Sequence, residues 1–98
     1  MSAEIPSIAI FEPLPGHETE ALSTMRELMS ALTAKGYSRD RLLRHVHPQR
    51  AGQYVLIRQW ASEEARRQAA EDSEILRYWA RLSHLIQIVT VYETLEDV

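Results

Sequence analysis

The feature that most constrains the fold of this chain is the stretch of residues 54–65, in which a strand pattern passes directly into a helix pattern. The β-branched residues Val55 and Ile57 favour a strand, and the run ends on Trp60. Ser62 follows and can accept a hydrogen bond from a free amide of the first helical turn. A bulky indole at such a junction lies where a sheet meets a helix. We therefore expect a small domain of one sheet and its helices, with Trp60 between the two layers.

The other segments continue this alternation. Strand patterns are expected over residues 5–11, 37–47, 53–60 and 85–95, and helix patterns over residues 17–35 and 62–82. The second helical region is expected to break near Asp72, and Gly36 is a natural residue to follow the end of the first helix. The order βαββαβ predicts an α+β, ferredoxin-like fold, in which a four-stranded antiparallel sheet carries two helices on one face.

One face of such a sheet has no helix to cover it. The last strand is apolar at most of its positions, so either alternate set would leave apolar side chains on that face. The two sets are Ile86, Ile88 and Tyr92, or Val89 and Val91. An antiparallel sheet can leave a polar face in water, but this strand is apolar on both faces. We therefore predict a homodimer in which the two sheets face one another.

Composition narrows the function classes. A chain of 98 residues suffices for one domain, and we expect residues 1–98 to form a single unit. The absence of cysteine excludes disulfides, thiolate metal sites and a cysteine nucleophile. The net charge of −3 gives no general attraction to nucleic acid or anionic membranes, and no apolar run approaches the roughly 20 residues that span a bilayer. These features predict a cytoplasmic protein that binds neither nucleic acid nor membrane.

The basic residues are unusual, because ten are arginine and only Lys35 is lysine. Arginine offers a planar fork of donors that suits carboxylates and stacks on aromatic rings. The bias therefore favours fixed ion pairs or an anionic ligand, although a GC-rich genome would produce the same composition.

The most prominent titratable pair is His45 and His47, which are two residues apart on an expected strand and so share one side of it. Two such imidazoles suit a pair of metal ligands or a base and its partner. They can equally be solvated side chains near a hairpin turn. The sequence indicates no third ligand, and we predict no metal site.

A second candidate group lies on the third strand, where Tyr54, Arg58 and Trp60 share one face. An arginine among apolar neighbours is either paired with a carboxylate or faces a cavity. Around a pocket, the trio would stack a planar aromatic molecule and stabilise a phenolate or enolate oxygen. Burial of Arg58 in a salt bridge would argue against that role. Tyr78 lies off the apolar stripe of its helix and could reach the pocket mouth, whereas Trp79 fits the stripe and is expected in the core.

Two short motifs carry a family resemblance. Pro15-Gly16 opens the first helix, and Trp60-x-Ser62-x-Glu64-Ala65 opens the second. With the βαββαβ order, they resemble the antibiotic biosynthesis monooxygenase (ABM) domain over essentially the whole chain. The resemblance implies a dimeric α/β barrel with a pocket between sheet and helices. Members of the superfamily include cofactor-free oxygenases of quinols and anthrones, haem-degrading enzymes, isomerases and cyclases.

The chain departs from part of this family. Several members have a histidine where Ala69 stands here. Haem-degrading members resemble one another in a first-strand asparagine and a helical histidine that ligates iron. This chain has no asparagine, and the matching helix region holds Tyr78 and Trp79 instead. Haem degradation is therefore not expected.

From the resemblance we expect a monooxygenase that needs no cofactor and acts on an electron-rich aromatic molecule such as a quinol or anthrone. In this interpretation the base is His45 or His47, and the cation beside the oxyanion is Arg58. The substrate-binding residues are Tyr54, Trp60 and Tyr78. The alternatives are an isomerase or cyclase that uses the same pocket, and a non-catalytic dimeric protein that binds a small ligand.

Overall fold

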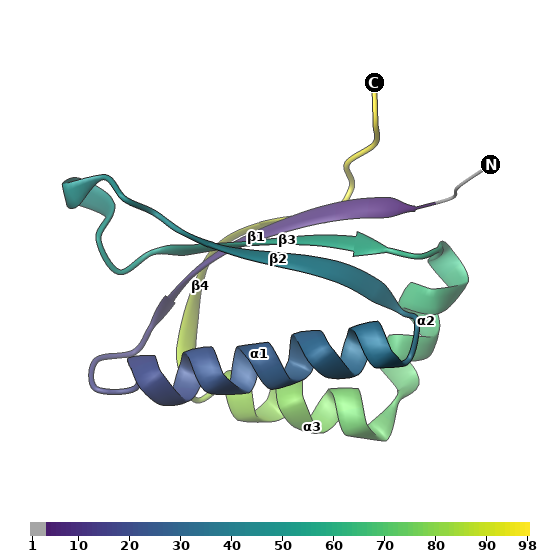
Figure 1. Cartoon of the computed structure of the whole chain (residues 1–98), viewed down its shortest axis with the longest axis horizontal. Coiled ribbons are helices and arrows are strands. Elements are labelled where there is room, and N and C mark those ends of the chain that lie inside the picture. Colours follow the sequence, from purple (N-terminus) through teal and green to yellow (C-terminus); the bar gives the residue numbers. More distant parts are fainter. Residues whose placement is uncertain (1–3) are drawn as a thin grey trace.

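The computed structural model describes residues 4–98, which form one antiparallel sheet with helices on a single side (Figure 1). The strands are β1 (Ile5–Pro13), β2 (Ser38–Arg44), β3 (Tyr54–Trp60) and β4 (Ile86–Tyr92). The helices are α1 (Glu18–Ala34), α2 (Glu63–Glu71) and α3 (Ser73–Leu82), with a 3₁₀ turn, η1 (Pro48–Arg50), between β2 and β3. The strand order is β2-β3-β1-β4, and every neighbouring pair is antiparallel. The predicted α+β, ferredoxin-like fold is confirmed, and the second helical region breaks at Asp72 as expected.

Local side-chain chemistry sets where the helices begin and end. The Ser62 hydroxyl accepts a hydrogen bond from the amide of Ala65 at 3.0 Å, as the sequence predicts for the start of α2. Gly36 follows α1 with φ of +74°, a backbone conformation that side chains with a Cβ disfavour. Ser38 at the start of β2 pairs with Trp60 at the end of β3, so β2 and α2 begin at the same end of the sheet.

Asp72 joins three elements at that end of the molecule. Its Oδ1 accepts from the amides of Glu74 at 2.9 Å and Ile75 at 3.3 Å, which caps α3. The Nζ of Lys35 donates to both carboxylate oxygens, at 3.0 and 2.8 Å, and the Tyr37 hydroxyl donates to Oδ2 at 2.9 Å. The hydrogen bonds from Lys35 and then Tyr37 lower the pKa of Asp72 from 3.8 to about 2. The same contacts raise the pKa of Lys35 and of Tyr37.

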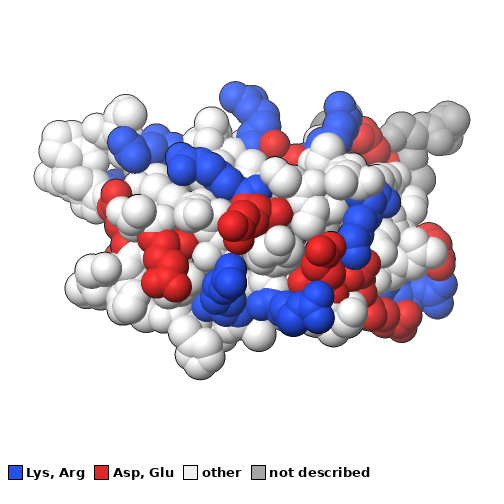
Figure 2. All heavy atoms as spheres, turned by 60° about the horizontal axis from the view of Figure 1, so that its bottom comes forward, with Lys and Arg blue, Asp and Glu red and all other residues white. Residues whose placement is uncertain are grey.

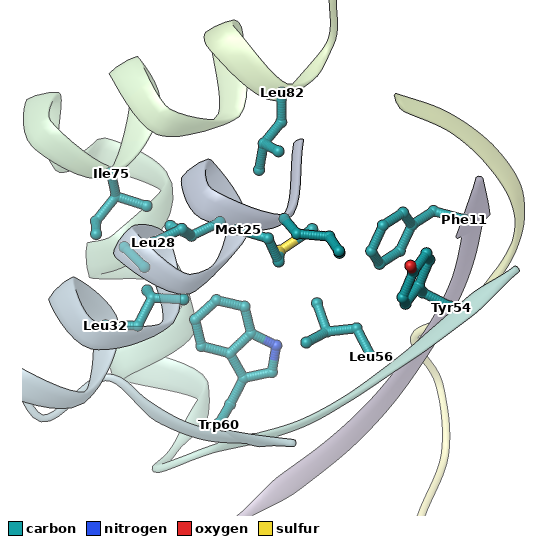
Figure 3. Close-up of a cluster of buried hydrophobic side chains, with 11 residues drawn as sticks. Phe11, Met25, Leu28, Leu32, Tyr54, Leu56, Trp60, Ile75 and Leu82 are labelled. Carbon is teal, nitrogen blue, oxygen red and sulfur yellow. The ribbon is translucent and has the colours of Figure 1, made fainter. Parts of the chain in front are cut away.

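The core lies between the helices and the central strands. Alternate residues of β3 share one face, as the sequence pattern predicts, and this face is buried against the helices: Tyr54, Leu56, Arg58 and Trp60. Figure 3 shows Leu28 and Leu32 of α1 and Ile75 of α3 grouped on the helical side of this core. The indole of Trp60 lies between those side chains and β3, where the layers meet.

The last strand differs from the prediction because it contains a β-bulge. Ile10 pairs with Thr90 whereas its neighbour Phe11 pairs with Ile88, so Val89 is an extra residue. The bulge changes the alternation partway along β4. Ile86, Ile88 and Val91 consequently face the helices, and Gln87, Thr90 and Tyr92 face the open side. Both predicted alternate sets of this strand are therefore wrong.

The helices cover the sheet unevenly. Helix α1 packs on β2 and β1, and α2 packs on β3. Helix α3 packs chiefly against α1, and few or no contacts join any helix to β4. The edge of the sheet formed by β4 therefore lies over a space that the helices do not fill. None of the helices among residues 4–98 has the length and apolar character needed to cross a membrane.

Candidate functional site

A cavity lies between the sheet and the helices, beneath β1 and β4. It has two adjoining lobes, of about 380 Å³ and about 330 Å³. The lobes share four lining residues, Ala9, Leu56, Arg58 and Trp79, which lie where they meet. Because Ala9 is small, β1 leaves room at this central position. The cavity is thus built from the part of the sheet that the helices cover least.

The two lobes differ in their walls. The first is mostly apolar and is completed by Phe11, Met25, Leu28, Leu82, Ser83, Ile86 and Ile88. The second carries more polar groups and is completed by Ser7, Trp60, Arg66, Ala70, Val91 and Glu93. Ile88 is 50% exposed, so the cavity opens to solvent along β4. An apolar space with a few polar groups is typical of a small-molecule site.

Arg58 is the charged side chain at the centre of this cavity, and it is paired. Its Nε donates to both oxygens of Asp40 at 3.0 Å, and its Nη2 donates to Oδ2 at 2.8 Å. The two residues face each other in the register of β2 and β3. The Asp40 side chain is only 1% exposed, and the Ser38 hydroxyl donates to its Oδ1 at 3.0 Å. The salt bridge that would argue against an oxyanion role for Arg58 is therefore present.

The pair still leaves Arg58 with donors to offer. Among residues 4–98, no hydrogen-bond acceptor contacts its remaining nitrogen, Nη1. The guanidinium carbon lies 5.4 Å from the centre of the Trp60 ring, which holds the side chain by a cation–π contact. The Nη1 of Arg58 can therefore donate a hydrogen bond into the cavity. Because Asp40 balances the charge of the guanidinium, Arg58 cannot act there as a free positive charge.

The predicted aromatic residues are distributed over three places. Trp60 is 6% exposed, so it is a core residue, and it also lines the second lobe. Tyr54 lies outside both lobes, stacked on Phe11 with ring centres 5.6 Å apart and covered by Arg44. Tyr78 points to the opposite side of the helices from the cavity. Only Trp60 of the three contributes to the cavity of this chain.

His45 and His47 lie outside the cavity as well. Both belong to the β2–β3 connection, which projects beyond the sheet (Figure 1). The Nδ1 of His47 accepts from the amide of Gln49 at 3.2 Å, and the Nδ1 of His45 lies 3.4 Å from the amide of His47. Both imidazoles thus support the local turn. Within the described part of the chain, no group of three or more His, Asp or Glu side chains could hold a metal ion.

The cavity also contains residues that sequence reasoning did not nominate. Trp79 was expected in the core because it fits the apolar stripe of its helix, yet it lines both lobes. Arg66 and Glu93 lie at the rim of the second lobe, with Nη2 and Oε2 3.7 Å apart. Trp79 could have been found from its neighbour Tyr78. Adjacent residues of a helix face different sides, so with Tyr78 on one side of α3 the aromatic residue on the cavity side is Trp79. No sequence signal joined Arg66 to Glu93.

A larger hollow of about 650 Å³ lies on the solvent side of the helices, between α1 and α3. Tyr78 lines it together with charged side chains. Lys35 pairs there with Glu74 at 3.0 Å, and Arg81 pairs nearby with Glu27 at 3.4 Å. Figure 2 shows basic and acidic side chains interspersed over this helical face. These charges pair with one another at the surface of the hollow.

Comparison with known proteins agrees with this architecture. A sequence profile of antibiotic biosynthesis monooxygenases matches residues 7–82. Among solved structures, SnoaB of Streptomyces nogalater, a cofactor-independent oxygenase, is 22% identical with a TM-score of 0.73, over 99% of this chain and 98% of that chain. A Pseudomonas aeruginosa protein is 21% identical with a TM-score of 0.72, over 98% of each chain. A Mycobacterium tuberculosis protein is 19% identical with a TM-score of 0.74, over 96% of this chain and 97% of that chain.

No curated protein matches the sequence significantly. The similar structures share so little sequence that they support the fold alone. The profile, in contrast, extends from β1 to the end of α3 and includes most of the residues that line the cavity. On this match the chain belongs to the antibiotic biosynthesis monooxygenase family.

Proposed function

We propose that this chain binds a flat aromatic molecule in the cavity beneath β4 and oxidises it as a cofactor-independent monooxygenase. The substrate class is an electron-rich aromatic such as a quinol or an anthrone. The observation that carries this proposal is the cavity itself, in which Trp79 and Arg58 both lie where the mostly apolar first lobe meets the second. A ring in contact with Trp79 would have its oxygen within reach of a hydrogen-bond donor.

The chemistry would come mainly from the substrate. A deprotonated anthrone can pass an electron to dioxygen, and the two radicals then combine at the ring carbon. Loss of water from the resulting peroxide converts the CH₂ group to a carbonyl. One oxygen atom of dioxygen enters the product and the other leaves as water, so no external reductant is needed. The protein would orient the ring and stabilise its anionic oxygen by hydrogen bonding.

In this proposal no histidine acts as the base of the reaction. His45 and His47 were predicted as the base, but neither lines the cavity of this chain. We propose that the substrate enters in its ionised form, and that Arg58 favours this form through Nη1. The rate should then follow the ionisation of the substrate and not that of a histidine. His45→Ala and His47→Ala variants are expected to keep their activity.

We also propose that the chain forms a homodimer through the open face of the sheet. Ile8, Ile10, Val55 and Ile57 form the centre of that face and are only half-buried. Tyr92, beside Ile8, is 52% exposed. A contiguous apolar surface of this kind is typical of an interface. In light scattering, Ile57→Lys should give a monomer, whereas Val46→Lys on the projecting hairpin should leave the dimer intact.

The oxygenase proposal is tested by measuring oxygen uptake with a panel of anthrones and quinols. Trp79→Ala is expected to lower the rate about tenfold, because the ring loses its stacking partner. Tyr78→Ala is the matched control, since Tyr78 is the adjacent aromatic on the other side of α3, and it should leave the rate unchanged. Equal losses in the two variants would contradict the assignment of the cavity as the active site.

A second candidate function is a non-catalytic protein that binds an aromatic ligand. The observation that favours it is the Arg58–Asp40 salt bridge, which removes the free charge from the cavity. This candidate predicts that aromatic molecules quench the fluorescence of Trp60 and Trp79 without any oxygen uptake. Binding together with uptake that depends on Trp79 would exclude it.

A further inference from the structure

The rim of the second lobe is crossed by an ion pair that differs from the others in the molecule. Arg66 comes from α2, and Glu93 follows β4 directly, so the pair connects the helical layer to the edge of the sheet. Its Nη2–Oε2 distance is 3.7 Å, which is too long for a hydrogen bond. The Glu93 side chain is 62% exposed and that of Arg66 is 30% exposed. Such a pair contributes little to stability.

The other two arginines near this site have hydrogen-bonded partners. Arg58 is held by Asp40, and Arg67, which follows Arg66 in α2, hydrogen-bonds Glu64 one turn earlier. Among residues 4–98, the guanidinium of Arg66 has no hydrogen-bond acceptor. Its donors are therefore open to a ligand, and no hydrogen-bonded carboxylate balances its charge as Asp40 balances that of Arg58. A planar guanidinium fork binds carboxylates through two parallel hydrogen bonds.

The interior of the cavity determines the chemical character of the rest of the ligand. The walls of its first lobe are mostly apolar, and Asp40 balances the charge of Arg58 at the centre. A localised charge such as a carboxylate would therefore lack a free counter-charge deep in the cavity, whereas at the rim it would meet Arg66. The ligand that fits is a flat aromatic body with a carboxylate at one end.

We propose that Arg66 binds the carboxylate of an aromatic carboxylic acid whose ring occupies the cavity, and that Glu93 occupies the guanidinium until this ligand replaces it. The inference rests on the proposed function, because it names the substrate class of the same cavity. Arg66 is a specificity-determining residue in this scheme, and Glu93 competes with the ligand for the guanidinium of Arg66. Entry of the ligand would also separate α2 from the end of β4.

The test uses the two tryptophans of the chain, since Trp60 and Trp79 both line the cavity and report binding by quenching. The probes are anthraquinone-2-carboxylate and the neutral anthraquinone-2-carboxamide, which share the same ring system. Arg66→Gln should weaken binding of the carboxylate about tenfold and leave the carboxamide unchanged. Arg67→Gln is the control on the neighbouring position and should change neither. Glu93→Gln should tighten binding of the carboxylate several-fold, because the competitor loses its charge.

The outcomes separate this inference from the proposed function. If wild-type protein binds both probes with equal affinity and Arg66→Gln affects neither, the inference is overturned while the cavity remains the binding site. Equal weakening of both probes by Arg66→Gln would also overturn it, since the residue would then act on the fold. If neither probe quenches the wild type, the cavity assignment and the inference both fail. Circular dichroism of each variant confirms that it is folded.

Discussion

The half of the molecule beneath β2 is filled, whereas the half beneath β1 and β4 is hollow. In the filled half, Leu32 and Ile75 are fully buried and belong to the same core cluster as Trp60. In the hollow half, Ile88 faces the same layer but is 50% exposed. The sheet is continuous across both halves, so the difference arises from the helices, which pack on β2, β1 and β3 and hardly on β4. The packed core and the space for a ligand are therefore separated within one layer.

The largest expected effect tests the boundary between the halves, where Arg58 and Asp40 meet. Asp40→Ala leaves a buried guanidinium without its partner and should lower the free energy of unfolding by about 3–5 kcal/mol. The double variant Asp40→Leu/Arg58→Met removes both charges and should recover most of that loss. Urea denaturation measures both. A double variant as unstable as Asp40→Ala would show that the charges themselves do not explain the cost.

The next prediction compares two isoleucines, one in each half. Ile75→Ala should cost about 3 kcal/mol, because it leaves a void in a packed core. Ile88→Ala removes the same atoms from the hollow half and should cost less than about 1 kcal/mol. The two costs come from the same denaturation experiment. Equal costs would mean that the hollow half closes in solution.

A smaller effect is expected from acid, and it belongs to the filled half. Asp72 holds α3 and the end of α1, and its pKa is lowered to about 2 by Lys35 and Tyr37. A lowered carboxyl pKa stabilises the folded state above the usual value of 3.8, and this stabilisation is lost as the pH falls toward about 2. The wild type should therefore be more stable than Asp72→Asn at pH 6, and the difference should disappear between pH 4 and pH 2. Thermal denaturation of both proteins over this range measures it, and a difference that does not depend on pH would contradict the role of the charge.

The smallest expected effect on stability comes from filling the hollow. Ala9 lines both lobes, so Ala9→Leu places a larger side chain where they meet. The added atoms enter an existing space, and the free energy of unfolding should stay within about 0.5 kcal/mol of wild type. Ligand quenching of the tryptophans should nevertheless be lost. A large destabilisation would indicate that the space is already occupied in the unliganded protein.

The fold could be predicted from the sequence because each element carries its own local signal. The alternation in β3 correctly placed Tyr54, Arg58 and Trp60 on one face, and Ser62 correctly marked the start of α2. These signals depend on spacing along the chain, which a sequence shows directly.

The site was less predictable because it depends on which distant residues meet. Asp40 becomes the partner of Arg58 only through the register of β2 on β3, and no spacing along the chain encodes that register. The placement of His45 and His47 depended on where β2 ends, and it ends at Arg44. The face of each residue in β4 depended on one bulge, which alternating apolar residues do not reveal.

That bulge has a consequence for how this scaffold can diversify. The extra residue Val89 shifts the alternation of side chains in β4, so that Ile88 and Val91 both line the cavity while Tyr92 lies on the open face. If β4 kept the same residues but had no bulge, strict alternation would turn Thr90 and Tyr92 toward the cavity and Val91 toward the open face. One local change in strand pairing can thus reassign side chains between ligand recognition and self-association, without touching the helices or the packed half of the core.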